Sequence, residues 1–180
     1  MPYRVMTVCT GNICRSPMAE VVLRQRFADA GLGDDVVVDS SGISDEEHGN
    51  PVDRRAASVL REHGYEVPRH RAHQATGEEL ADRDLVLAMT SRHARWLRTQ
   101  APDADVAERV VVYRSFDPEA PAVEGAGAVA DESALDIDDP WYGDRSDFET
   151  TLEQVEAAAD AVVEHVRAEL GRRRPDGTAG

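Results

Sequence analysis

The sequence predicts an α/β fold with a doubly wound, four-stranded parallel sheet flanked by helices. Four short segments are rich in valine and leucine and almost continuously apolar, as expected for parallel strands that are buried on both faces. Longer helix-like segments separate them, and this alternation is typical of right-handed β-α-β units. A length of 180 residues suits one domain with its own core, which we expect over residues 1–171.

The elements follow one another in a regular order. The four strands are expected at Arg4–Val8, Val36–Asp39, Asp84–Met89 and Arg109–Tyr113. Four helices are expected at Ser16–Ala30, Pro51–His63, Gly77–Ala81 and Ser91–Thr99. A long final helix is predicted because apolar residues recur at steps of three and four from Phe148 to Leu170, with Gly171 as its C-cap.

Two segments lack such a pattern. Residues 117–138 are rich in alanine, proline, glycine and acidic residues without a sustained period, which predicts a long flexible acidic loop within the domain. Residues 172–180 follow the last helix and are expected to form a disordered tail.

The composition limits what the chain binds. Its net charge is −15, and binding to nucleic acid or to an anionic membrane needs a basic surface, so neither partner is expected. No segment reaches the roughly 18 apolar residues of a transmembrane helix, and the N-terminus lacks a signal-peptide pattern. Two cysteines, five positions apart, are too few for a secreted disulfide framework. We therefore expect a cytoplasmic location.

The segment VCTGNICRSP directly follows the first predicted strand. Five residues separate Cys9 from Arg15, and a loop of this length can wrap its backbone N–H groups around a phosphate. Gly11 lets the backbone turn where a Cβ would obstruct it. With Ser16 as N-cap and Pro17 as the first helical residue, the next helix directs the positive end of its dipole at the loop. The segment therefore predicts a phosphate-binding loop after the first strand.

The side chains of this loop suit phosphate transfer. A helix N-terminus and a nearby cation lower thiol pKa values to roughly 3.5–7.5, so Cys9 is predicted to attack phosphorus as a thiolate. Arg15 offers a planar fork to two phosphate oxygens, and Ser16 can hydrogen-bond the sulfur and ease its departure. A Cys-x5-Arg spacing alone arises by chance, and a lone cysteine is more often a buried apolar residue. The glycine, the Ser-Pro pair and the preceding strand favour the catalytic interpretation.

At these residues the chain resembles the low-molecular-weight protein tyrosine phosphatase family of bacterial type. The run CTGNICRSPMAE is similar to that family's phosphate loop, and the similarity continues through Asp39–Ser40, Leu60–Gly64, His70–Ala72, Asp139–Gly143 and Ser146–Glu149. The resemblance implies a phosphotyrosine-protein phosphatase that hydrolyses aryl phosphate monoesters through a cysteinyl-phosphate, without a metal or other cofactor. It also implies a tyrosine-phosphorylated protein as substrate. We expect a monomer, with a tyrosine kinase as a candidate partner.

A phenolate is a poor leaving group unless it is protonated as it departs, so hydrolysis of an aryl phosphate needs a general acid. The two Asp-Pro pairs provide candidates in Asp117 and Asp139. Asp139 is favoured because Trp141 and Tyr142 follow it, rings that can flank a phenyl group, and because the family's acid lies in an Asp-Pro-aromatic loop. The adjacent Asp138 is an alternative acid.

The resemblance also assigns the rest of the site. Its substrate-binding residues are Thr10, Gly11, Asn12, Ile13, Cys14, Ser16, Trp141 and Tyr142. Hydrogen bonds that hold the loop in shape are expected from Asn12, Ser16, Ser40 and His70, with His63 and His73 as alternatives to His70. Many relatives have an aromatic wall where this chain reads Asp45-Glu-Glu-His48, so we expect an acidic lip that tolerates basic peptide flanks. Cys14 is expected to trap an oxidised Cys9 as a disulfide.

Three alternatives compete with this interpretation. A thioredoxin-coupled arsenate reductase has a similar loop but needs further cysteines downstream, and none follows Cys14. A protein-arginine phosphatase of the same fold carries threonine at the position of Ile13, where isoleucine favours an aryl group. A non-catalytic phosphotyrosine-binding module generally loses the nucleophile, the arginine or the acid, and all three are present. The arginine phosphatase and the non-catalytic binding module therefore stay open as alternatives to the tyrosine phosphatase.

Overall fold

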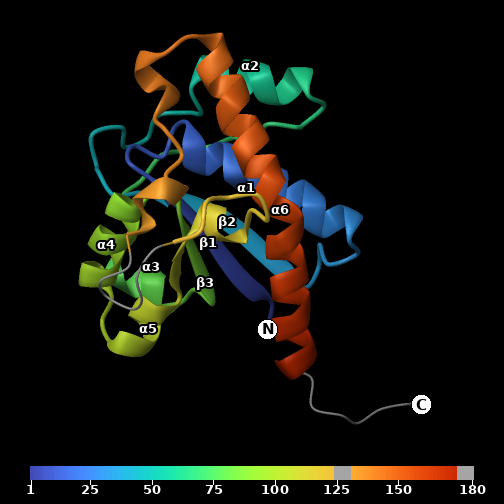
Figure 1. Cartoon of the computed structure of the whole chain (residues 1–180), viewed down its shortest axis with the longest axis vertical. Helices are drawn as coiled ribbons and strands as arrows, with labels where there is room; N and C mark the ends of the chain where they lie inside the picture. Colours follow the sequence, from blue (N-terminus) through green and yellow to red (C-terminus); the bar gives the residue numbers. More distant parts are fainter. Residues whose placement is uncertain (124–130, 174–180) are drawn as a thin grey trace.

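The computed structural model describes residues 1–123 and 131–173 (Figure 1). Its centre is a sheet of four parallel strands in the order β2-β1-β3-β4, which confirms the predicted fold class. The strands are β1 (Tyr3–Cys9), β2 (Val36–Gly42), β3 (Leu85–Ala88) and β4 (Val110–Val112). In register, Val5 of β1 lies opposite Val38 on one side and Leu85 on the other.

Helices cover both faces of the sheet (Figure 1). One layer consists of α1 (Arg15–Asp29), α2 (Arg54–Glu62) and the long α6 (Arg145–Arg173). The other consists of α3 (Gly77–Ala81), α4 (Ser91–Gln100) and α5 (Ala104–Glu108). None of the helices in the described ranges combines the length and the apolar character that a membrane crossing requires.

The alternation of side chains along β1 explains why both faces are buried. Val5 and Cys9 belong to the core beneath α1, α2 and α6, whereas Met6 and Val8 belong to the core beneath α3, α4 and α5. Successive residues of a strand point to opposite faces, so a strand between two helical layers must be apolar throughout. This is the pattern that the sequence shows.

Three elements differ from the sequence-based expectation. Short α5 was not predicted; it is held by the Asp103 side chain, which accepts a hydrogen bond from Val106 N–H. The segment predicted as a loop at 117–138 contains a 3-10 helix, η3 (Glu132–Leu135), while its residues 124–130 lie outside the described ranges. The last helix does not end at Gly171 but continues to Arg173, and residues 174–180 of the predicted tail also lie outside the described ranges.

Contacts of Arg173 account for the longer helix. Its guanidinium donates to Asp84 at 2.8 Å and lies over the ring of Tyr3, 4.5 Å from the centroid. A glycine inside a helix costs only about 1 kcal/mol, which an ion pair and a cation–π contact at the start of the sheet can offset.

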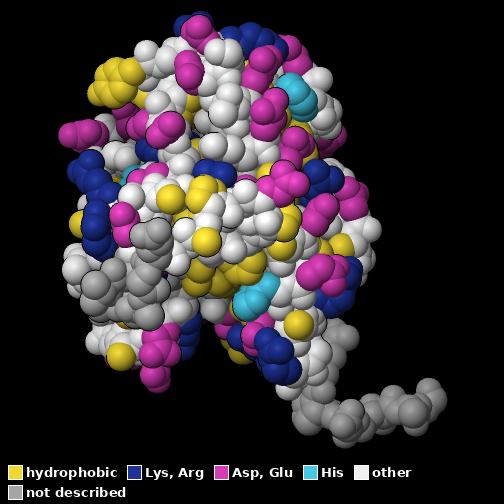
Figure 2. Space-filling model, viewed as in Figure 1, with side chains coloured by type: hydrophobic (Ala, Val, Ile, Leu, Met, Phe, Trp, Pro, Cys, Tyr) yellow, Lys and Arg dark blue, Asp and Glu magenta, His cyan; other side chains and the backbone are white. Residues whose placement is uncertain are grey.

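Acidic and arginine side chains are interspersed on the face of the molecule that Figure 2 shows, without a single large basic patch. Ion pairs between the two kinds of side chain include Arg145 with Glu62 and Arg26 with Asp160. On the face that Figure 2 shows, the arginines are thus distributed among acidic residues.

Candidate active site

The loop Thr10–Cys14 joins the carboxyl end of β1 to the start of α1. Because β1 lies between β2 and β3, this loop occupies the point where the strand order reverses, the usual position of a ligand site in an open α/β sheet. The loop also packs tightly against Gly42 at the end of β2. A Cβ on Gly42 would lie 2.6 Å from the Thr10 carbonyl oxygen, so glycine is required there.

Two details of the loop differ from the prediction. The residue with left-handed backbone in this loop is Asn12, with φ of 58°. At Gly11, where the sequence predicts an obstruction, the atom nearest to an added Cβ is Cγ of the flexible Glu47 side chain, 3.0 Å away. Asparagine tolerates this conformation better than most residues. Ser16 is not the N-cap either, because α1 begins at Arg15. The Ser16 hydroxyl instead lies 3.1 Å from Cys9 Sγ.

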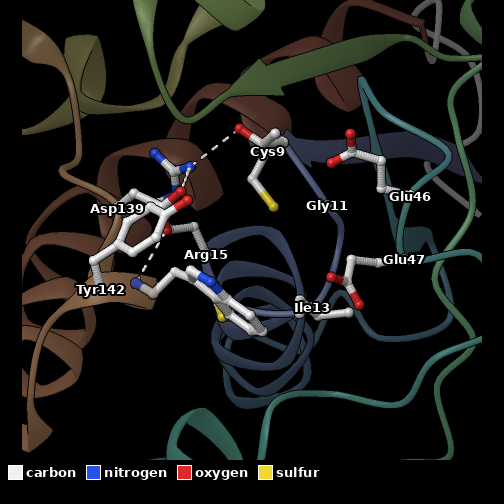
Figure 3. Close-up of a pocket in the computed structure, with 11 residues that line it drawn as sticks. Cys9, Gly11, Ile13, Arg15, Glu46, Glu47, Asp139 and Tyr142 are labelled. Atoms are coloured by element: carbon white, nitrogen blue, oxygen red, sulfur yellow. Dashed lines mark hydrogen bonds and ion pairs between the residues drawn. The ribbon is translucent and has the colours of Figure 1, made fainter.

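Cys9 is buried at the base of a pocket, and Figure 3 shows its sulfur pointing into the centre of the lining residues. Asn12 N–H donates to the sulfur at 3.3 Å. Ser16 Oγ can donate either to the sulfur or to the Ser41 carbonyl oxygen, both 3.1 Å away. A negative sulfur attracts that single proton, so two donors can stabilise a Cys9 thiolate.

Arg15 is held rigidly beside the sulfur, with only 5% of its side chain exposed. Its Nη1 donates to the Ile137 carbonyl oxygen at 2.9 Å. Its Nη2 donates to Asp139 Oδ2 at 2.9 Å, with a weaker contact of 3.3 Å to Thr10 Oγ1. Figure 3 shows Arg15 and Asp139 side by side in the pocket. Its buried Nε has no hydrogen-bond partner among the described residues. A guanidinium has five N–H donors and these contacts use three of them, so the Nε–H is left for a ligand oxygen.

Asp139 reaches the same pocket from the segment before α6. It caps the 3-10 helix η4 (Pro140–Tyr142), accepting a hydrogen bond from Trp141 N–H at 3.2 Å. The other two candidate acids do not line the pocket. Asp117 forms an ion pair with Arg114, and Asp138 is exposed to solvent. The geometry therefore favours Asp139.

A network of buried hydrogen bonds supports the loop from below. The Asn12 amide donates to Ser16 Oγ at 3.0 Å and to Ser40 Oγ at 2.9 Å. His70 Nε2 lies 2.6 Å from the Asn12 carbonyl oxygen. His63 contacts the Val59 carbonyl oxygen of its own helix instead. The structure thus brings Asn12, Ser16, Ser40 and His70 together, as the sequence analysis expected.

His73 supports the phosphate loop through its backbone and not through its ring. Its N–H donates to Asn12 Oδ1 at 3.2 Å, whereas its ring lies 3.0 Å from Glu79 Oε1. A variant that removes the His73 side chain therefore leaves this hydrogen bond to the loop in place.

Two further residues of the site were not identified from the sequence. Glu20, one turn after Ser16 on α1, accepts a hydrogen bond of 2.5 Å from Ser40 Oγ and extends the network. His93 of α4 is buried, and its Nε2 lies 2.9 Å from Thr10 Oγ1. Burial and the nearby Arg15 lower the pKa of His93 to about 3, so its ring is neutral. A neutral Nε2 can accept the Thr10 hydroxyl proton while Thr10 accepts from Arg15.

The rim of the pocket has two different sides (Figure 3). Asp139 and Tyr142 form one side, where Trp141 and Tyr142 are exposed aromatic side chains. Glu46 and Glu47 form the opposite side, in the position expected for an acidic lip. Substrate flanks that carry positive charge would meet carboxylates there.

Cys14 also lines the pocket but is buried, with 4% exposure. Burial, with the nearby carboxylate of Asp53 adding to it, raises the pKa of the Cys14 thiol. Cys14 is therefore a neutral thiol, and of the two sulfurs we expect Cys9 to react first with an oxidant.

We expect mild peroxide to inactivate the protein reversibly. Cys9 is oxidised to a sulfenic acid, and the Cys14 thiol displaces water from it to form a disulfide before irreversible oxidation proceeds. The measurement is the fraction of starting activity that dithiothreitol restores, in the wild type and in Cys14→Ser. A lower recovered fraction in Cys14→Ser is expected, and equal recovery would show that Cys14 only packs beneath the loop.

The family model described as low molecular weight phosphotyrosine protein phosphatase matches residues 4–172 of the chain. The chain is 44% identical over 173 residues to the low molecular weight protein-tyrosine-phosphatase of Streptomyces coelicolor, covering 96% of this chain and 99% of that protein. It is 44% identical over 174 residues to low molecular weight protein-tyrosine phosphatase A of Mycobacterium tuberculosis, covering 97% and 98%. Among solved structures, the low molecular weight protein tyrosine phosphatase from T. tengcongensis is similar, with a TM-score of 0.73, 31% identity and coverage of 91% and 99%.

Proposed function

The chain belongs to the low molecular weight phosphotyrosine protein phosphatase family, enzymes that hydrolyse phosphotyrosine through a cysteinyl-phosphate, and from this premise we propose how its own residues divide the work. Cys9 is the nucleophile, Arg15 binds the phosphoryl group, and Asp139 is the general acid. The observation that carries the proposal is the meeting of these three side chains in one pocket at the end of β1, although 124 positions separate Arg15 from Asp139.

In the first step the Cys9 sulfur attacks phosphorus, and the S–P bond forms as the P–O bond to the phenol breaks. Asp139 donates its proton to the departing phenolate oxygen. Arg15, through its free Nε and through the Nη2 that Asp139 now occupies, binds the equatorial oxygens. Phosphate binding therefore competes with Asp139 for Arg15, and it frees the carboxyl group to face the departing oxygen.

In the second step water attacks the cysteinyl-phosphate and releases inorganic phosphate. Asp139, now a carboxylate, accepts a proton from the attacking water, and the S–P electron pair returns to sulfur. The Ser16 hydroxyl, 3.1 Å from Cys9 Sγ, stabilises the departing thiolate. The buried network around Asn12 keeps the loop in one conformation, so little reorganisation is needed in either step.

We further propose that the substrate is a tyrosine-phosphorylated protein and not phosphoarginine. Ile13 lines the pocket with an apolar side chain, and the rings of Trp141 and Tyr142 stand at its rim. A phenyl ring is stabilised by contact with these apolar and aromatic surfaces. A guanidinium in the same place would lose its hydration, because the side chain at position 13 offers it no polar partner.

The test compares hydrolysis of a phosphotyrosine peptide with that of a phosphoarginine peptide of the same sequence. The wild type is expected to prefer phosphotyrosine by about 10- to 100-fold in kcat/KM, a range that small changes in a pocket lining produce. Ile13→Thr should narrow that preference. A preference of the wild type for phosphoarginine would favour the arginine phosphatase, and tight binding of phosphotyrosine without release of phosphate would favour the binding module.

Other properties complete the proposal. We propose a monomeric, cytoplasmic enzyme whose single phosphatase domain covers residues 1–171 and whose partners include a tyrosine kinase. Two cysteines, five positions apart, are too few for a secreted disulfide framework, which supports a reducing compartment. Sedimentation of the purified chain would test the monomer.

A further inference from the structure

Arg55, in the first turn of α2, lies outside the set of residues that line the pocket but contacts the segment that carries the general acid. Asp53, the N-cap of α2, fixes it from one side. Asp53 Oδ1 lies 3.1 Å from Arg55 Nε and Oδ2 lies 3.2 Å from Nη2, a two-point pairing that orients the whole guanidinium. The Arg55 side chain is thus held in place although about 41% of it is exposed.

The remaining nitrogen of Arg55 points to the backbone that follows Asp139. Nη1 donates to the Trp141 carbonyl oxygen at 3.1 Å and, more weakly, to the Gly143 carbonyl oxygen at 3.4 Å. Its guanidinium carbon also lies 5.4 Å from the centroid of the Trp141 ring and 4.6 Å from that of Phe148. The middle and the C-cap of η4, and the first buried turn of α6, therefore contact one cation.

The same unit is tied to the phosphate loop. Asp53 N–H donates to the Ile13 carbonyl oxygen at 2.8 Å. A continuous path therefore runs from the loop that holds the nucleophile, through Asp53 and Arg55, to the backbone two residues beyond Asp139. Asp139 is itself half-exposed, and among the described residues its carboxylate is held by Arg15 and by Trp141 N–H, so its distance from the Cys9 sulfur depends on such a path.

We propose that Arg55 is a positioning residue that holds the Asp139 segment at the correct distance from the phosphate loop, so that the general acid meets the departing oxygen. The inference rests on the proposed role of Asp139. Arg55 does not contact the substrate; it acts by fixing the carbonyl groups of Trp141 and Gly143. A misplacement of a catalytic group by 1 Å can cost about 10²-fold in rate.

The test measures kcat/KM of Arg55→Ala and Arg55→Lys over a series of aryl phosphates with leaving groups of increasing pKa. We expect a loss of about 10- to 100-fold for poor leaving groups and little loss for good ones. Lysine keeps the charge but cannot form the two-point pairing with Asp53, so Arg55→Lys should show the same trend. If Arg55→Ala does not fold, the Arg55→Lys variant alone tests the proposal.

A double-mutant cycle with Asp139→Ala provides the decisive comparison. If Arg55 acts through Asp139, Arg55→Ala adds almost no loss in the Asp139→Ala background. Arg145→Ala is the matched control, since Arg145 also links α6 to α2, through Glu62, and should leave the leaving-group dependence unchanged.

Each other outcome overturns the proposal in a recognisable way. Equal losses across the leaving-group series, additive with Asp139→Ala, would show that Arg55 supports only the fold or the phosphate loop. If Asp139→Ala itself is insensitive to the leaving group, the proposed general acid fails, and the role of Arg55 fails with it. If the loss caused by Asp139→Ala depends on the leaving group and the loss caused by Arg55→Ala does not, Asp139 remains the general acid and the proposed positioning role of Arg55 is wrong.

Discussion

Cys9→Ser is expected to reduce kcat by about 10³-fold or more, because a serine hydroxyl at neutral pH is a far weaker nucleophile than a thiolate and no cysteinyl-phosphate can form. The fold should persist, since serine is of similar size and Asn12 N–H and Ser16 Oγ can hydrogen-bond its oxygen as they do the sulfur. Turnover of a small aryl phosphate measures the first point, and thermal unfolding the second.

Cys14→Ser is the matched control, the same chemical change on the same loop. Its buried sulfur is not the reacting atom, so it should retain turnover far above that of Cys9→Ser. Binding of inorganic phosphate to Cys9→Ser, followed by calorimetry, should remain detectable because Arg15 is unchanged. Retention of more than about one per cent of wild-type kcat by Cys9→Ser would contradict the assignment of the nucleophile.

The parts of the site that the sequence predicts are those that are contiguous in the chain. Cys9, Arg15 and Ser16 lie within eight residues on a strand, loop and helix start, and that local pattern fixes their spacing. The choice of Asp139 over Asp117 also follows from neighbours in sequence, the two rings after the Asp-Pro pair. The sheet is predictable for a similar reason, since a short and almost continuously apolar run is a local signal of a buried parallel strand.

The residues that sequence analysis missed reach the site through long-range contacts. His93 lies 83 positions from Thr10, and Arg55 lies 86 positions from Trp141. Neither carries a local signature: each is a polar residue in the first turn of a helix, where such residues are common. Only the packing of α4 and α2 against the end of the sheet shows what they contact.

The backbone conformation of the loop depends on Asn12 as well as on Gly11. The sequence predicts that Gly11 lets the loop turn where a Cβ would obstruct it, but the positive φ lies at Asn12. Asn12 takes that conformation because its side chain is fully used, donating to Ser16 and Ser40 and accepting from His73 N–H. Three hydrogen bonds, two of them buried, compensate a strained backbone that costs about 1–2 kcal/mol.

Asp139→Ala is expected to slow the hydrolysis of aryl phosphates by an amount that depends on the leaving group. General acid catalysis accelerates a reaction by about 10²–10⁴-fold. The variant should lose this whole factor when the phenolate is basic and must be protonated as it departs. With an acidic phenol the loss should be small. The measurement is the slope of log(kcat/KM) against the pKa of the leaving phenol, which should become steeper in the variant.

Asp117→Ala is the matched control, because Asp117 is the other aspartate that precedes a proline and it pairs with Arg114 away from the pocket. Its slope should equal that of the wild type. Asp138→Ala tests the neighbouring carboxylate in the same way. A steeper slope in either of these variants, with an unchanged one in Asp139→Ala, would transfer the role of the acid to that residue.

The same Asp139→Ala variant should bind inorganic phosphate at least as well as the wild type. In the resting site Asp139 Oδ2 occupies Arg15 Nη2 at 2.9 Å, so removing the carboxylate frees a donor and removes a like charge from the anion. Weaker turnover combined with unchanged or tighter phosphate binding is a result that general damage to the loop cannot produce, because damage to the Asn12 network would weaken both. The measurement is competitive inhibition by inorganic phosphate, with an aryl phosphate of low leaving-group pKa as the substrate. It separates loss of the general acid from damage to the loop. An inhibition constant that rises in the variant would mean that Asp139 supports phosphate binding rather than proton transfer.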